Sequence, residues 1–199
     1  MTTLSDTLPV VTPADHIPGP PQGRWTYAAY TALPADGNRY EIVDGVLYMA
    51  PAPVIAHQDA SGWFFFYLTT HVRLAGLGRV FVAPVDVELA PNVVTQPDVV
   101  VVLNANLDII TPSHIVGAPD LVVEIASPST AGYDRRTKQD AYARAGVPEY
   151  WIADADARTV EVLLLERGAY RSTGVFRGQA TLPSQAVPNL PVRVEQFFA

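Results

Sequence analysis

The segment 121–154 constrains the fold most, because it reads as strand, loop, helix and strand in succession. Residues 121–126 (LVVEIA) form an apolar, β-branched run that predicts a strand. The stretch 127–130 (SPST) ends this strand, and residues 133–145 predict a helix. Residues 149–154 (EYWIAD) then predict a second strand. Two strands joined by a crossover helix form a right-handed parallel unit, so we expect an α/β fold.

Two side chains in this unit are unusual for a purely structural element. Glu124 lies within the apolar strand, although a fully buried carboxylate without a partner is almost never found. Lys138, the only lysine of the chain, lies on the following helix and reaches Glu124 if that helix crosses the strand. Alternatively, Lys138 forms an ordinary surface pair with Asp134, four residues earlier. A carboxylate and an ammonium at a strand end are typical of sites that cleave phosphodiesters, so we expect another acid elsewhere.

Length and composition exclude several classes of protein. The 199 residues, 49% of them hydrophobic, predict one domain over 24–199, and the Pro-, Thr- and Asp-containing stretch 1–23 predicts a mobile N-terminal tail. The chain has no cysteine, which excludes disulfides and zinc thiolate sites. It shows neither a basic secretory leader nor a long apolar span, so we expect a cytoplasmic protein with no membrane contact. The net charge of −7 argues against broad binding to polyanions.

Other elements are predicted on both sides of the central unit. In chain order they are a short helix at 26–30, a hairpin over 39–50 with its turn at Asp44–Gly45, a helix over 55–76, a strand over 79–89, an apolar central strand over 99–103, a loop over 104–118 and strands from 159 onward.

Three of these elements carry candidate functional side chains. Glu41 lies on the first arm of the hairpin, where it could equally form the polar face of an edge strand. His57 begins the long helix, and a lone histidine there is more often structural than catalytic. Asp98 follows Pro97 at the entrance of the central strand. Asp98 and Glu124 are thus acids on two successive predicted strands, although a Pro-Asp pair alone is no functional signal.

Taken together, these motifs resemble the PD-(D/E)XK nuclease superfamily and, more closely, the Uma-two family of restriction endonucleases. The resemblance spans roughly Trp25 to Phe198 and rests on YEIVDG (40–45), His57, PDVVV (97–101), VVEIASPST (122–130), Asp134, Lys138, Tyr142 and GVPEYWIAD (146–154). It implies an α/β restriction-endonuclease-like fold, with a central mixed β-sheet flanked by helices and additional hairpins at its edges.

The resemblance also implies a site and an activity. Ala126 stands where the superfamily has its lysine, and Lys138 fits a position relocated to the helix. The implied catalytic residues are Asp98, Glu124 and Lys138, with Glu41 and His57 as additions. Asp98, Glu124 and the carbonyl of Ile125 would bind Mg²⁺ or Mn²⁺, since hard cations prefer oxygen ligands. The implied function is a metal-dependent endonuclease acting on DNA, and cleavage of both strands is compatible with a homodimer.

Two other functions remain open from the sequence. A nuclease-fold module could bind nucleic acid or a protein partner without cleaving, which agrees with the few basic residues. An oligomerisation domain is suggested by the aromatic run from Trp63 to Tyr67. Tyr142 could pack in the core or line the site, and most charges such as those of Arg135 and Arg136 are simply solvated.

Overall fold

The computed structural model describes residues 11–34, 36–50, 52–126 and 133–199, with the backbone alone for 133–135. Its helices are α1 (Tyr27–Tyr30), α2 (Ile55–Leu68) and α3 (Gln139–Ala145), with shorter helical segments at Thr69–Arg73, Asn104–Ile109, Tyr133–Lys138 and Val194–Phe198. Its strands are β1 (Thr12–Pro13), β2 (Arg39–Val43), β3 (Val46–Ala50), β4 (Gly78–Val82), β5 (Val87–Ala90), β6 (Val93–Thr95), β7 (Val99–Leu103), β8 (Ile115–Val116), β9 (Leu121–Ala126), β10 (Glu149–Asp154), β11 (Thr159–Glu166) and β12 (Ala169–Arg177).

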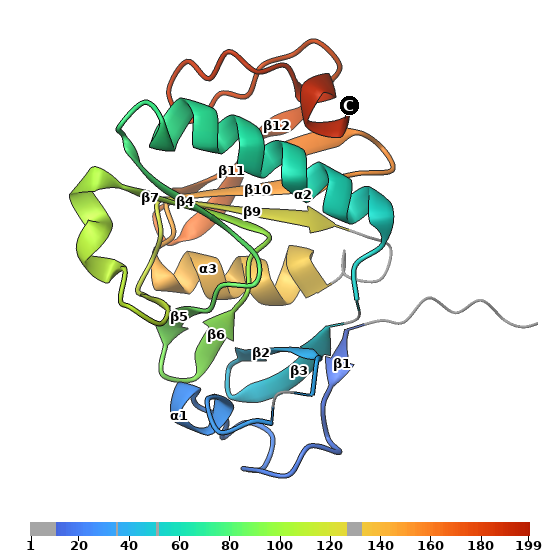
Figure 1. Ribbon diagram of the computed structural model, residues 1–199, viewed down its shortest axis with the longest axis vertical. Coiled ribbons are helices and arrows are strands. Elements are labelled where there is room, and N and C mark those ends of the chain that lie inside the picture. Colours follow the sequence, from blue (N-terminus) through green and yellow to red (C-terminus); the bar gives the residue numbers. More distant parts are fainter. Residues whose placement is uncertain (1–10, 35, 51, 127–132) are drawn as a thin grey trace, which may run out of the picture.

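The strands form two sheets, which lie one above the other in Figure 1. The core sheet has the order β12-β11-β10-β9-β7-β4, and the hairpin sheet has the order β1-β3-β2-β6-β5-β8. In the core sheet β9 and β10 are parallel, with Glu124 opposite Ile152, whereas the other neighbours are antiparallel. The predicted parallel unit and mixed sheet are therefore confirmed. The expected edge hairpins instead build a second sheet, because β2 and β3 pair with β6 and β1 and not with the core sheet.

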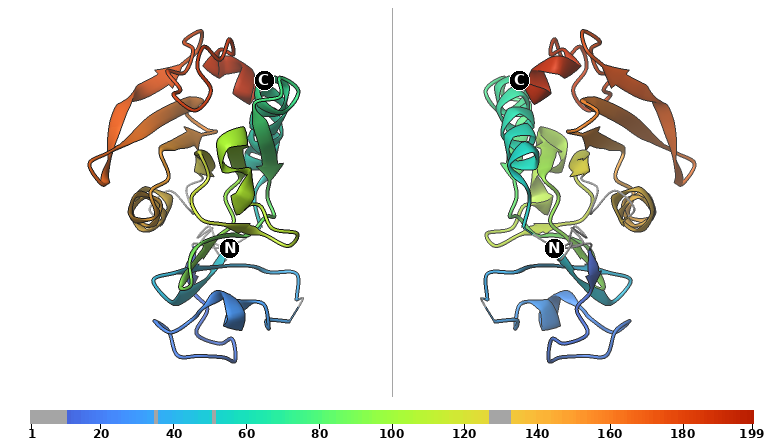
Figure 2. Two further views of the ribbon diagram at one scale, coloured as in Figure 1. Left: turned by 90° about the vertical axis from the view of Figure 1, so that its left-hand side faces the viewer. Right: turned by 90° about the vertical axis from the view of Figure 1, so that its right-hand side faces the viewer.

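Helices α2 and α3 cover opposite faces of the core sheet, as Figures 1 and 2 show. Under α2, Phe64 packs in one cluster with Val101 and Val123, and its ring stacks on Phe197 with 4.2 Å between the ring centroids. Under α3, Tyr142 packs with Val122 on the other face. Because side chains alternate along a strand, Glu124 points to the α3 face in the middle of β9.

Three local predictions differ from the structure. The single strand expected over 79–89 is two strands in different sheets, because Pro84 has no N–H to continue the ladder. The helix expected over 55–76 is regular only as far as Leu68, and a wider π-helical turn follows it. The loop expected over 104–118 contains a short helical segment and strand β8.

The stretch 11–23, which the sequence assigns to a mobile tail, packs against the hairpin sheet. Strand β1 pairs with β3, and the N–H of Ala14 donates to the carbonyl of Leu47 at 2.8 Å. Ala14 is buried, and Trp25 joins the same cluster. Within the described ranges, no helix has the length and apolar character needed to span a membrane.

Candidate active site

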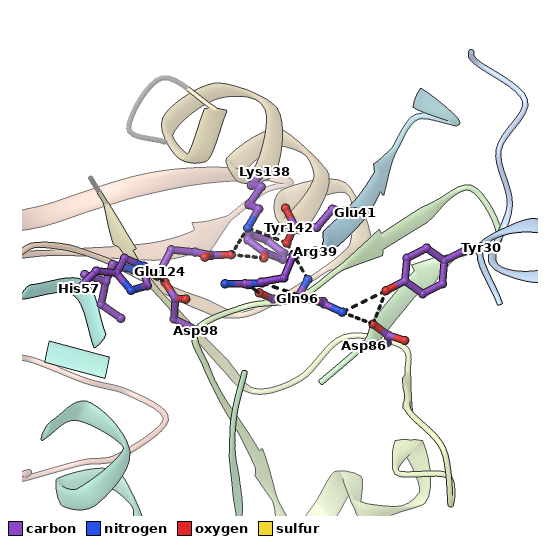
Figure 3. Close-up of polar contacts among 11 residues, drawn as sticks. Tyr30, Arg39, Glu41, His57, Asp86, Gln96, Asp98, Glu124, Lys138 and Tyr142 are labelled. Carbon is purple, nitrogen blue, oxygen red and sulfur yellow. Dashed lines mark hydrogen bonds and ion pairs between the residues drawn. The ribbon is translucent and has the colours of Figure 1, made fainter. Parts of the chain in front are cut away.

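The five residues that the sequence singles out come together where the two sheets meet (Figure 3). Glu41 comes from β2 of the hairpin sheet, and Glu124 comes from β9 of the core sheet. Asp98 lies in the short connection from β6 to β7, which leads from one sheet to the other. His57 comes from the first turn of α2, and Lys138 directly precedes α3. All five side chains are buried.

The ammonium of Lys138 is the centre of one half of the site. Its Nζ atom lies 2.9 Å from Oε1 of Glu124 and 2.9 Å from Oε1 of Glu41. Only 4% of Lys138 is exposed, so these contacts form in an environment that screens charge weakly. The backbone N–H of Gln96 also donates to Oε1 of Glu41 at 2.7 Å. Glu41 therefore does not lie on the polar face of an edge strand, because β2 is an inner strand between β3 and β6.

Tyr142 completes the surroundings of Glu124. Its hydroxyl donates to Oε1 of Glu124 at 2.6 Å, one turn along the helix from Lys138. Burial, together with the charges of Glu124 and Glu41, holds the pKa of the Tyr142 phenol well above its ordinary value. Tyr142 therefore stays a neutral donor, and of the two alternatives left open by the sequence it both packs and lines the site.

Asp98 is the centre of the other half. Its Oδ2 atom accepts the backbone N–H of Ile125 at 2.8 Å and lies 3.0 Å from Nε2 of His57. Burial raises the pKa of the Asp98 carboxyl, but the hydrogen bond and charge of His57, the Ile125 N–H and the charge of Lys138 outweigh it and lower the pKa. Asp98 is therefore an ionised carboxylate despite its burial.

His57 is itself oriented by its own helix. The Ser61 hydroxyl donates to the backbone carbonyl of His57 at 2.8 Å and lies 3.4 Å from Nδ1 of the ring. With its proton directed at the carbonyl, Ser61 presents a lone pair to Nδ1, so both ring nitrogens face oxygen acceptors. The ring is thereby fixed toward Asp98.

Some residues of the site carry no chemical signature that would reveal them in the sequence. Gln96 donates from its side chain to the Tyr30 hydroxyl at 3.0 Å and to Asp86 at 2.8 Å. Arg39 donates in turn to the carbonyl of Gln96 at 2.9 Å. The available signals are positional: Gln96 directly precedes the Pro97–Asp98 pair, and Arg39 shares a strand face with Glu41.

Other predicted contacts fall elsewhere. The side chain of Asp134, the alternative partner of Lys138, lies outside the described residues. The same holds for the stretch 127–130, which the sequence predicts to end the strand, and for the side chain of Arg135. Arg136 is exposed. Asp154 ends β10 at a turn, where its carboxylate accepts the N–H of Ala157 at 2.8 Å.

The oxygen atoms of the site fit a hard divalent cation. Asp98 directly precedes β7, the neighbour of the Glu124 strand β9, and among the described residues the Oδ1 atom of Asp98 accepts no hydrogen bond. The N–H of Ile125 points to Asp98, and in an extended strand the carbonyl of the same residue points to the same side. Within the described part of the chain, no group of three or more acids and histidines is placed to hold a metal ion, so Asp98 and Glu124 offer only part of a ligand set. Magnesium suits such a partial set, because it usually keeps several waters.

These elements define an α/β protein of the restriction-endonuclease-like fold, with its polar site at the junction of two sheets. The chain belongs to the Uma2 family, described as "Putative restriction endonuclease", whose model matches residues 27–195. The family resemblance seen in the sequence is thus confirmed. Family and fold together indicate a restriction-endonuclease-like nuclease.

One solved structure resembles the chain over most of its length. It comes from Anabaena variabilis ATCC 29413 and is described as "a putative nuclease belonging to DUF820". The TM-score is 0.73 at 20% sequence identity, and the match covers 87% of this chain and 97% of the other. At this identity the likeness shows the fold. None of the curated proteins matches the chain.

Proposed function

We propose that the protein hydrolyses phosphodiester bonds in DNA with the help of Mg²⁺ or Mn²⁺. The observation that carries this proposal is the position of Lys138. Its buried ammonium lies 2.9 Å from the carboxylate of Glu124, which comes from β9, and β9 pairs with the strand β7 that follows Asp98. Two carboxylates can hold a divalent cation, and an ammonium can stabilise the negative charge that develops during hydrolysis of a phosphodiester. The membership in a family of restriction-endonuclease-like proteins supports the same reaction.

The proposed division of labour follows from the contacts. A bound divalent cation would lower the pKa of a water molecule and neutralise charge on the phosphate. Asp98, Glu124 and the carbonyl of Ile125 would hold that cation, and His57 keeps the Asp98 carboxylate turned toward Ile125. Lys138 would stabilise negative charge or orient the attacking water.

The remaining groups position the reacting ones. Tyr142 and Lys138 both bind Oε1 of Glu124, which fixes the orientation of its carboxylate. Glu41 holds the other side of the Lys138 ammonium. In the reaction the attacking water gives up a proton to solvent and its oxygen bonds to phosphorus. The ester bond from phosphorus to the leaving oxygen breaks, and the leaving oxygen takes a proton from solvent.

Cleavage of supercoiled plasmid and of single-stranded DNA in the presence of Mg²⁺ or Mn²⁺ tests the proposal. We expect the wild-type protein to cut at least one of these substrates, and the Asp98→Asn and Lys138→Met variants to lose cutting. Arg171→Gln is the matched control, because Arg171 is exposed on β12 and, among the described residues, pairs only with Glu166. If all four proteins cut equally, the activity comes from a contaminant and the assignment fails.

Binding without cleavage would favour the other function considered, a nuclease-fold module that no longer cuts. This outcome has a specific signature. Such a module would bind DNA with equal affinity with or without divalent cation, and Asp98→Asn would leave that affinity unchanged.

A further inference from the structure

A small pocket opens beside Asp98 and His57. Its volume is about 130 Å³. Its lining combines a charged side, made by Arg39, His57 and Asp98, with an apolar side, made by Pro53, Val82 and Pro84. A nucleotide has the same two characters, because its phosphate is charged and its sugar and base have apolar faces.

The Arg39 guanidinium is fixed on the wall of this pocket. Its Nε atom donates to Oε1 of Gln96 at 3.3 Å, and its Nη2 atom donates to the Gln96 carbonyl at 2.9 Å. Gln96 is itself held by the Glu41 carboxylate, the Tyr30 hydroxyl and Asp86. Arg39 therefore cannot turn away without breaking a buried network.

Arg39 differs from an ordinary structural arginine in its partners. Both of its hydrogen bonds go to the neutral Gln96, and no described carboxylate lies within ion-pair distance of its guanidinium. Arg39 is half-buried, and arginines withdrawn from water normally pair with an acid. Its Nη1 atom makes no hydrogen bond with the described residues, so two N–H donors remain available at the pocket. Guanidinium groups bind phosphate well because their donors match its oxygens.

We propose that Arg39 is a substrate-binding residue that holds a phosphate of the nucleic acid in this pocket, with the sugar of that nucleotide against Pro53, Val82 and Pro84. This assignment rests on the proposed function for its substrate class. It does not depend on cleavage, because the contact forms in the bound complex.

The test measures binding in a protein that cannot cut. Fluorescence anisotropy of a labelled oligonucleotide with Mg²⁺ compares Asp98→Asn with the double variants Asp98→Asn/Arg39→Gln, Asp98→Asn/Arg39→Lys and Asp98→Asn/Arg171→Gln. We expect Arg39→Gln to weaken binding by about tenfold or more, which corresponds to the loss of one charged contact. The Arg39→Lys double variant keeps the charge, so its affinity should lie between those of Asp98→Asn and Asp98→Asn/Arg39→Gln. The Arg171→Gln double variant should bind as tightly as Asp98→Asn.

The salt dependence separates phosphate binding from a structural role. Loss of one phosphate contact makes the slope of log affinity against log salt less steep by roughly 0.7–0.9. An arginine that only braces Gln96 would leave this slope unchanged. Thermal unfolding of each variant verifies that it is folded, and Arg39→Lys provides the comparison if Arg39→Gln is unstable.

Two results would overturn the assignment. One is equal affinity and equal salt slope for Asp98→Asn and Asp98→Asn/Arg39→Gln. The other is an Asp98→Asn protein that binds no oligonucleotide. If the proposed cleavage is wrong but the assignment of Arg39 is right, the wild-type protein binds DNA through Arg39 and does not cut it.

Discussion

The Nζ atom of Lys138 lies 2.9 Å from Oε1 of Glu41, and this contact joins the segment before α3 to the hairpin sheet. The same atom binds Glu124 of the core sheet. One ammonium thus bridges carboxylates from two sheets that share no strand. The candidate active site and the junction of the sheets are therefore the same structure, and changes at Lys138 should affect both stability and activity.

Replacement of Lys138 by methionine should lower the free energy of unfolding by about 3–5 kcal/mol, since it leaves Glu41 and Glu124 buried without their cation. Urea unfolding measures this loss. Adding Glu124→Gln to Lys138→Met should recover part of the stability, because it removes one of the uncompensated charges, while cleavage stays absent. A double variant no more stable than Lys138→Met would contradict the role assigned to the pair.

The stability of the protein should depend on the ionisation of Asp98 in acid. The pKa of Asp98 lies below its ordinary value of 3.8, so its contribution to stability is present above that value and is lost as the pH falls through the lower folded-state pKa. We therefore expect urea midpoints of the wild type to fall more steeply below about pH 4 than those of Asp98→Asn. Parallel profiles for the two proteins would show that Asp98 has the same pKa folded and unfolded.

Metal binding should depend on the same carboxylate. Calorimetric titration with Mn²⁺ should show uptake by the wild type and a loss of affinity of more than about tenfold in Asp98→Asn. Asp44→Asn is the matched control, because Asp44 is an exposed acid that pairs with Arg144 on the surface. Equal uptake by all three proteins would place the cation elsewhere.

Core packing under α2 should contribute to stability without touching the site. Phe64 is fully buried and stacks on Phe197, so Phe64→Ala should cost about 3–5 kcal/mol. Thermal or urea unfolding measures the loss. At a temperature where the variant is folded, its affinity for Mn²⁺ should equal that of the wild type, and a large change in affinity would show that α2 packing also positions His57.

Local sequence signals predict much of this fold. The β9–α3–β10 unit follows from its apolar runs and from Gly146, which takes a left-handed conformation with φ of 87° at the end of α3. The hairpin follows from Asp44 and Gly45, whose φ angles of 53° and 74° are those of a type I′ turn. In both cases neighbouring residues in the sequence determine the geometry.

Sheet membership depends on distant partners and could not be predicted in this way. Strands β4 and β5 are close in sequence, yet β4 pairs with β7 and β5 pairs with β6 and β8. The residues of the site likewise differ in how far the sequence alone reveals them. Acids and a lone lysine stand out against apolar strands, whereas Gln96 and Arg39 look ordinary until the fold brings them to Asp98.

The shared ammonium of Lys138 also limits how this protein can change during evolution. A descendant that abandons catalysis cannot simply lose its lysine, because two acids on separate sheets would then repel each other in the interior. It must replace the three side chains nearly together. A homologue that keeps the fold but has lost this lysine should therefore carry neutral or apolar residues at the positions of Glu41 and Glu124 as well.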